Sequence, residues 1–151
     1  MKKIFKFIII LIPWFIGGII FKSDIIFYKY LNKPSFAPKP IIFAIVWPIL
    51  YTLISISIYK IYKNNNYKSI PEYNKSLLVN YFSNQIFSFL FFTIKSPFLA
   101  LIDTFIIFIT SLFLYYETKE INKNSSKFLI PYILWNMYAL VLIVSVLFLN
   151  L

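Results

Sequence analysis

The sequence predicts an all-α membrane protein, a single domain over residues 1–151 built as a bundle of five transmembrane helices with a long ordered loop between helices 1 and 2. Composition is the first observation: 60% of the residues are hydrophobic and 13% are charged, whereas soluble domains carry roughly 25% charged residues. The second is that the apolar residues gather in runs near the ~20 residues that a helix needs to cross a bilayer. A chain of 151 residues has room for one such domain.

Five apolar runs account for the predicted helices. They cover residues 4–21, 41–62, 77–94, 98–116 and 128–149. Lys2 and Lys3 precede the first run, as they would in a signal peptide, but no small-residue cleavage site follows Phe21. We therefore expect the first run to be retained as a transmembrane helix. Gly17 and Gly18 in its second half allow close approach by a neighbouring helix or a ligand.

The connector at residues 22–40 is the most specific segment. Pro34, Pro38 and Pro40 fix φ and bias the preceding residues away from the helical region, so an ordered, extended loop is predicted. It leads into a helix on which Trp47 and Tyr51 lie one turn apart on the same face. A stiff aromatic loop beside an aromatic helix face suits a lid over a flat apolar ligand.

The other connectors are shorter or more polar. Residues 63–76, KNNNYKSIPEYNKS, are rich in Asn and are predicted to form a solvated loop. Residues 95–97 are predicted to form a tight turn, and residues 117–127 a further connector.

The formal net charge is +10, and every basic residue is Lys. Bidentate recognition of phosphates and bases uses Arg, and these Lys residues lie at the edges of apolar runs. We interpret them as membrane anchors and expect no nucleic-acid partner. Five spans place the termini on opposite sides, with more Lys on the N-terminal side. The positive-inside rule then places the N-terminus in the cytoplasm, in a bacterial cell membrane.

The chain has no Cys and no His, which excludes disulfides, zinc fingers and a His-ligated haem. Asp103 is the one acid well inside a predicted span. Intramembrane acids are functional candidates, but its place early in a helix, where the dipole favours negative charge, favours a structural role. No nucleophile–base pair or metal site can be assembled around it. We therefore predict no catalytic residue and no metal.

Two further helix faces carry candidate binding residues. In the third run, Asn84, Phe87, Ser88 and Phe91 share one face. The amide and the hydroxyl need partners inside the bundle, which either a neighbouring helix or a ligand supplies. In the fifth run, Trp135 lies about one and a half turns inside the span, one turn before Ala139, so a bundle-facing position is expected.

Ordered blocks of residues carry a resemblance to a known family. The blocks are Phe27-Tyr28, Leu31, Lys33-Pro34, Phe36 and Pro38; Phe43, Val46-Trp47 and Leu50-Tyr51; Ser83-Asn84, Phe87-Ser88 and Phe91-Phe92; Ala100-Leu101-Ile102-Asp103; and Phe128-Leu129, Pro131-Tyr132-Ile133, Trp135, Tyr138 and Ala139. Over nearly the whole chain they resemble the TspO/MBR family, the tryptophan-rich sensory proteins whose animal members are called translocator protein or peripheral-type benzodiazepine receptor.

The resemblance implies a five-helix bundle that forms homodimers in lipid. It also implies binding of porphyrins, haem-related tetrapyrroles and benzodiazepine-type drugs as ligands, with no tightly bound cofactor. Carried onto this chain, it implies a ligand-binding pocket lined by Tyr28, Trp47, Tyr51, Asn84, Phe87, Ser88, Trp135 and Ala139. The chain departs from the family pattern at four positions: Phe36 and Phe87 replace Trp, Lys39 replaces Pro, and Ile143 replaces Asn.

The leading hypothesis is therefore a membrane receptor or sensor for tetrapyrroles. The first alternative is light-dependent breakdown of protoporphyrin, in which Trp47 and Trp135 would be the active residues. The second is a carrier of small hydrophobic molecules, which lacks the inverted repeats typical of transporters. The third is a structural membrane protein without a ligand.

Overall fold

A computed structural model of the chain describes residues 2–151, so that Met1 of the predicted domain lies outside the described residues. The described part is mainly helical and has no strand, and the all-α prediction is confirmed. The helices are α1 (Lys2–Leu11), η1 (Ile12–Phe15), α2 (Ile16–Ile20), α3 (Ile25–Tyr30), α4 (Pro40–Asn64), η2 (Tyr67–Ser69), α5 (Pro71–Ser88), the π-helical η3 (Phe89–Thr93), α6 (Pro97–Ile121), α7 (Lys123–Ser126), η4 (Lys127–Leu129) and α8 (Ile130–Leu149).

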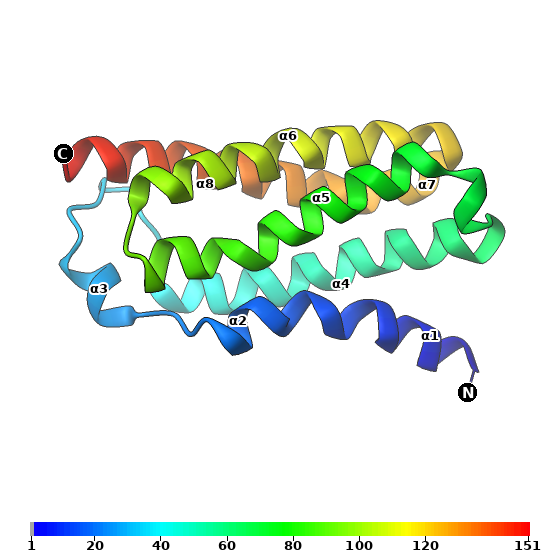
Figure 1. Cartoon of the computed structure of the whole chain (residues 1–151), viewed down its shortest axis with the longest axis horizontal. Coiled ribbons are helices and arrows are strands. Elements are labelled where there is room, and N and C mark those ends of the chain that lie inside the picture. The colour runs from blue at the N-terminus through cyan, green and yellow to red at the C-terminus, as the bar shows by residue number, and fades with distance from the viewer. Residues whose placement is uncertain (1) are drawn as a thin grey trace.

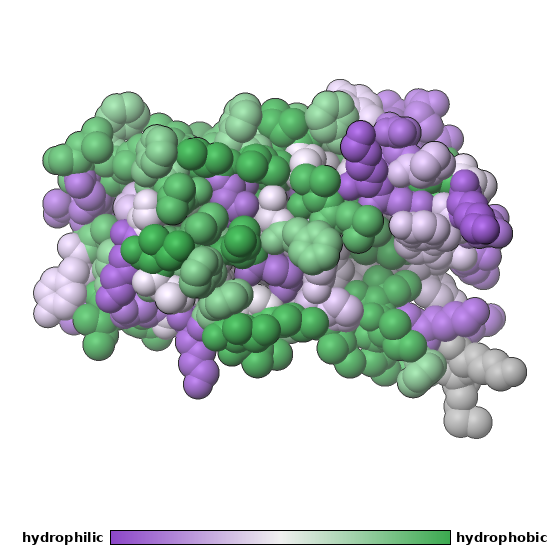
Figure 2. Space-filling model, viewed as in Figure 1, coloured by the Kyte–Doolittle hydropathy of each residue, from purple (hydrophilic) through white to green (hydrophobic). Residues whose placement is uncertain are grey.

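The protein is a multi-pass integral membrane protein. Within residues 2–151, four helical segments are long and apolar enough to cross a bilayer: Lys3–Ile20, Pro40–Asn64, Pro97–Ile121 and Lys123–Leu149. In Figure 2, hydrophobic side chains cover most of the middle of the visible face, and hydrophilic ones gather at the end that carries α7.

Five spans, as predicted from the sequence, are not confirmed. The predicted run at residues 77–94 lies in α5 and η3, which are not among the four segments. The physical reason is composition: α5 carries Asn80, Asn84 and Gln85 in the stretch where the other long helices are apolar.

The predicted long loop between the first two helices is also not confirmed, because a helix interrupts it. The side chain of Asp24 accepts a hydrogen bond from the Phe27 backbone N–H at 2.8 Å and so caps the start of α3. Tyr28 therefore lies on a helix. The non-helical parts are residues 21–24 before α3 and the proline-containing residues 31–39, which end where Pro40 starts α4.

Residues 63–76 are mostly exposed, as predicted for a solvated segment, but helices occupy most of it and it is not a simple loop. Helix α5 begins at Pro71, a residue well suited to the first helical turn. Tyr73 is 1% exposed, and Asn74 is buried as well. The Asn74 side chain accepts from the Tyr62 hydroxyl and donates to the Tyr67 carbonyl, so that this end of the molecule is well ordered.

The long helices lie along one axis, and the N- and C-termini are at opposite ends of it (Figure 1). Helix α6 packs closely against both α5 and α8, while α1 packs on α4 and α2 on α5. Contacts between the backbones of α4 and α5 are sparse. Side chains, rather than close backbone packing, therefore separate α4 from α5 and leave room for a cavity near α3.

Candidate functional site

A cavity of about 690 Å³ lies between the helices at the end of the molecule that carries α3. Its lining comes from η1, α2, α3, α4, α5, η3, α6 and α8. All eight residues predicted to bind a ligand line this one cavity: Tyr28, Trp47, Tyr51, Asn84, Phe87, Ser88, Trp135 and Ala139. The structure thus brings them together, and their binding role stays a prediction.

Aromatic rings form the walls of the cavity. Trp47 lies 5.4 Å from Tyr51 and 6.4 Å, edge to face, from Trp135. Across η3, Phe87 and Phe91 stack at 5.7 Å with 17° between their planes. Large rings that contact one another in this way offer flat apolar surface to a ligand.

A chain of hydrogen bonds crosses the bundle at the inner end of the cavity. The Tyr51 hydroxyl donates to Asn84 Oδ1 at 2.8 Å, and Asn84 Nδ2 donates to the Tyr132 hydroxyl at 3.0 Å. Tyr132 in turn donates to Asn80 Oδ1 at 2.9 Å. Asn80 Nδ2 donates to the Ile107 carbonyl of α6. Both side-chain polar atoms of Asn84 therefore bind neighbouring helices, one of the two alternatives that the sequence left open.

Two buried donors beside the cavity have no hydrogen-bond partner among residues 2–151. They are Nε1 of Trp135 and Nδ2 of Asn136, and both residues line the cavity. Buried polar groups are nearly always paired, so each exception calls for an explanation. One indole N–H and one amide N–H beside an apolar cavity suit an acceptor oxygen of a ligand, such as a carboxylate or a carbonyl.

The cavity reaches the surface between α2 and α3, where its lining residues Ile19 and Ile25 are 68% and 61% exposed. Gly18 lies at the same edge, and a Cβ there would meet nothing within 4 Å. Gly17 packs against α5, and its N–H donates to Gln85 Oε1 at 2.6 Å. The two adjacent glycines thus have different surroundings, one in a helix contact and the other at the mouth.

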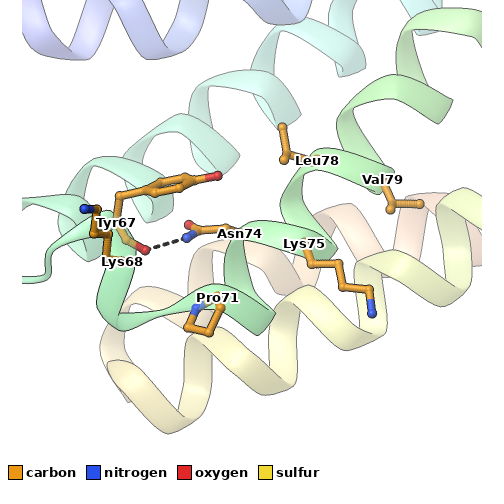
Figure 3. Close-up of a pocket in the computed structure, with 7 residues that line it drawn as sticks. All are labelled: Tyr67, Lys68, Pro71, Asn74, Lys75, Leu78 and Val79. Carbon is orange, nitrogen blue, oxygen red and sulfur yellow. Dashed lines mark hydrogen bonds between the residues drawn. The ribbon is translucent and has the colours of Figure 1, made fainter.

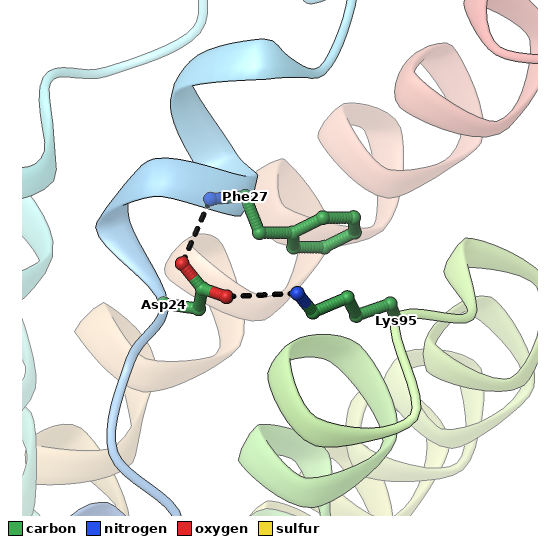
Figure 4. A network of polar contacts seen from close by, with 3 residues as sticks. All are labelled: Asp24, Phe27 and Lys95. Carbon is green, nitrogen blue, oxygen red and sulfur yellow. Dashed lines mark hydrogen bonds and ion pairs between the residues drawn. The ribbon is translucent and has the colours of Figure 1, made fainter.

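Helix α3 is held in place by an ion pair, shown in Figure 4. Lys95 Nζ lies 3.0 Å from Asp24 Oδ2 and 5.5 Å from the centre of the Phe27 ring. The Phe27 backbone N–H and, secondarily, Lys95 lower the pKa of Asp24 below its ordinary value. Lys95 occupies the left-handed region with φ 59° in the turn before α6, at the place where a tight turn was predicted.

The proline-containing stretch covers a different part of the molecule from the one expected of a lid. The Phe36 ring packs edge to face on Tyr138, whose hydroxyl donates to the Phe36 carbonyl at 2.9 Å. Asn32 exchanges hydrogen bonds with Asn150 after α8. Phe36 does not line the cavity. The cover is therefore α3 with Tyr28, and the proline-containing stretch fastens it to α8.

Several cavity residues were missed by sequence reasoning, among them Trp14, Phe15, Gln85 and Asn136. Trp14 is 2% exposed and stacks on Tyr51 at 5.6 Å. The sequence feature that could have pointed to Trp14 is Pro13, because a proline inside the first apolar run interrupts the helix, here with the short 3-10 helix η1. The Pro13 carbonyl accepts from the Tyr81 hydroxyl on α5. Gln85 had a signal too, as a second amide beside Asn84 in an otherwise apolar run.

Asp103 does not line the cavity. It is 5% exposed, and its Oδ2 has no hydrogen-bond partner within residues 2–151. Ile143, which replaces the Asn of the family pattern, is buried and does line the cavity. This substitution leaves an apolar surface where an amide would otherwise stand.

The chain is similar to one protein family and to several known proteins. A sequence model described as the TspO/MBR family matches residues 7–149. The chain is 34% identical over 126 residues to "Tryptophan-rich protein TspO" of Bacillus cereus, covering 83% of this chain and 82% of that protein. It is also 34% identical over 123 residues to "Uncharacterized membrane protein YtaB" of Bacillus subtilis, covering 82% and 79%. A similar protein of Archaeoglobus fulgidus, also named "Tryptophan-rich protein TspO", is 27% identical over 127 residues, covering 82% and 79%.

Proposed function

This chain belongs to the TspO/MBR family, and on that premise we propose that it is a membrane receptor or sensor that binds porphyrins and related flat, hydrophobic molecules. The ligand occupies the cavity between the helices, and α3 covers it. Binding sites for drug-sized ligands are apolar cavities of about 300–1,000 Å³ with a few well-placed polar groups, and a volume of about 690 Å³ falls inside that range.

The observation that carries this proposal is the pair of unpaired donors in an aromatic cavity. Trp47, Phe87 and Trp135 present flat rings to the interior. Nε1 of Trp135 and Nδ2 of Asn136 have no acceptor among the residues that the structure describes. A porphyrin supplies both features that are missing, a large flat apolar body and carboxylate oxygens at its edge.

The proposal is tested by titrating the purified protein in detergent with protoporphyrin and following the absorbance of the porphyrin. We expect saturable binding. Trp135→Phe keeps an aromatic ring, smaller than the indole, but removes the N–H donor. Affinity should therefore fall by up to about tenfold, the range of one hydrogen bond. Phe36→Leu removes an aromatic ring outside the cavity and serves as the matched control, with unchanged affinity. A linear titration in the wild type would mean that the cavity takes no porphyrin.

A second candidate function, light-dependent porphyrin breakdown, has one observation in its favour. The oxidisable indoles of Trp47 and Trp135 contact each other at 6.4 Å and both line the cavity. Illuminating the titrated complex distinguishes the two functions. A new absorbing product that is lost in Trp47→Phe supports the enzyme, and a spectrum identical to that of porphyrin in detergent alone supports the receptor.

We further propose that α5 and η3 form a fifth pass, so that the N-terminus is cytoplasmic in a bacterial cell membrane and the chain works as a homodimer there. The polar residues of α5 support this reading of the topology. Asn80 and Asn84 are buried and bind neighbouring helices, while Leu78, Val79, Phe82 and Ile86 are exposed. A helix of this kind presents hydrocarbon to lipid, although its average hydropathy is low.

A further inference from the structure

A second hollow, of about 390 Å³, lies at the end of the molecule opposite to the cavity, where η2 leads into α5. Figure 3 shows its lining side chains. Two are basic, Lys68 and Lys75, and the apolar ones include Pro71, Leu78 and Val79. We name this hollow the η2–α5 groove.

The walls of the η2–α5 groove are folded rather than loose. The Tyr67 carbonyl accepts a hydrogen bond from Asn74 Nδ2 at 2.6 Å, the contact dashed in Figure 3. The Tyr67 ring stacks on that of Tyr62 at 6.4 Å. The Lys68 backbone N–H donates to Asn66 Oδ1. The segment that carries Lys68 is therefore fixed against the start of α5, and the Lys68 and Lys75 side chains lie on either side of Pro71 in Figure 3.

The charge of the groove is unbalanced. Lys68 and Lys75 are both exposed. Within residues 2–151, the ion pair between Asp24 and Lys95 is the one salt bridge, so neither Lys of the groove has a carboxylate partner. Glu72 lies one turn before Lys75 but does not line the groove. Two ammonium groups thus border a hollow without a counter-charge.

An apolar stripe runs away from the groove along α5. Leu78, Val79, Phe82 and Ile86 follow Lys75 at i+3, i+4, i+7 and i+11 and so share a face. All four are exposed, Phe82 to 64%. From Leu78 to Ile86 the stripe extends roughly 12 Å at the helical rise per residue. A pair of cations at one end of an exposed apolar stripe matches the two parts of a phospholipid.

We propose that the η2–α5 groove binds one anionic phospholipid, with its phosphate between Lys68 and Lys75 and an acyl chain along the apolar stripe. Charge-assisted hydrogen bonds from two ammonium groups to phosphate oxygens hold the headgroup. Apolar contact with Leu78 and Phe82 holds the chain. This site is separate from the cavity, and the proposal does not depend on porphyrin binding.

The test uses the full chain in phosphatidylcholine bilayers doped with phosphatidylglycerol, with native mass spectrometry to count retained lipids. We expect one phosphatidylglycerol to be retained in preference to phosphatidylcholine. Lys68→Gln with Lys75→Gln should lower that preference by roughly thirtyfold, the order expected for two Lys side chains near an anionic surface. The matched control is Lys119→Gln with Lys123→Gln, which removes the same charge at the same end of the molecule and should leave the preference unchanged.

A third variant tests the groove without changing charge. Val79→Trp fills the space below Lys75 and should displace the retained phosphatidylglycerol, while circular dichroism checks that the helices persist. Three results would overturn the proposal: equal loss in both Lys pairs, which would reduce the effect to general attraction by basic residues; retention that Val79→Trp leaves intact; and displacement of the lipid by inorganic phosphate alone, which would point to an ion site.

Discussion

Two neighbouring glycines show how single positions determine helix packing in this protein. A Cβ on Gly17 would lie 2.6 Å from the backbone oxygen of Gln85 and 2.9 Å from its Cα, closer than van der Waals contact allows. A Cβ on Gly18 would meet nothing within 4 Å. Gln85 Oε1 lies in the space beside Gly17 and accepts a hydrogen bond from the Gly17 N–H. Gly17 is therefore required for the close packing of α2 on α5, and Gly18 is not.

Gly17→Ala should destabilise the protein by about 1–3 kcal/mol, because α2 must shift away from the α5 backbone. Gly18→Ala should be neutral or stabilise it by up to about 1 kcal/mol, since Ala is the better helix former. Thermal unfolding in detergent measures both, and each variant is the control for the other. Equal melting temperatures would show that α2 does not pack on α5 as described.

At the scale of one element, α3 depends on the contacts of its N-cap residue, Asp24. Asp24 both accepts the Phe27 N–H and pairs with Lys95 on the turn before α6. At the other end of α3, Lys33 Nζ donates to the carbonyls of Tyr28 and Leu31. A six-residue helix is too short to be stable by itself, so these contacts maintain the cover over the cavity.

Asp24→Ala should loosen α3 more than Asp24→Asn, because Asn keeps the N-cap and loses only the ion pair. The expected signature is faster hydrogen exchange of the α3 amides, with α8 as the internal reference. In the wild type, the folded pKa of Asp24 lies below the ordinary value of 3.8. Its stabilisation is therefore present above pH 3.8 and is lost as the pH falls through the lowered folded pKa. Unchanged hydrogen exchange of the α3 amides in both variants would show that Asp24 does not stabilise α3.

Helix α5 shows at the same scale how buried amides lower the average hydropathy of a helix inside a bundle. Its amides Asn80 and Asn84 take part in the hydrogen-bond chain with Tyr51 and Tyr132. Paired polar groups of this kind are stable within a membrane protein. The average over the helix counts them as polar all the same, although both are buried.

For the whole molecule, the cavity follows from uneven packing. Helix α6 is closely packed on α5 and α8, whereas α4 lies next to α1 and contacts α5 sparsely. Side chains bridge the wider gaps: Tyr51 contacts Asn84 between α4 and α5, and Trp47 contacts Trp135 between α4 and α8. The space that remains is the cavity of about 690 Å³.

The proposed fifth pass makes a prediction for the whole chain. If α5 and η3 cross the bilayer, reporter tags placed before Lys2 and after Leu151 must lie on opposite sides of the membrane. Protease protection in inverted and right-side-out vesicles measures this, with a tag in the residues between α6 and α8 as the marker for the N-terminal side. Tags on the same side would contradict the five-pass topology.

The sequence by itself determined the helical class, the membrane location and the family. Apolar runs near 20 residues have few other stable forms in a bilayer, and blocks such as Phe87-Ser88 and Trp135 keep their order along the chain. The family resemblance also supplied eight residues that line one cavity, and a helix period of 3.6 residues places several of them on shared faces. The errors of the sequence prediction fell where a few contacts decide: the Asp24 cap that makes α3 a helix, and the buried Tyr73 and Asn74 that extend α5 into a supposed loop.

Only the tertiary structure decided which of these faces meet and which donors stay unpaired. Asn84 had two possible partners in the sequence, and the approach of Tyr51 and Tyr132 selected one of them. Trp135 Nε1 remained without an acceptor, and the proline-containing stretch packed on α8 rather than over the cavity. Periodicity fixes the direction of a side chain relative to its own helix, whereas its neighbours depend on contacts between residues far apart in the chain.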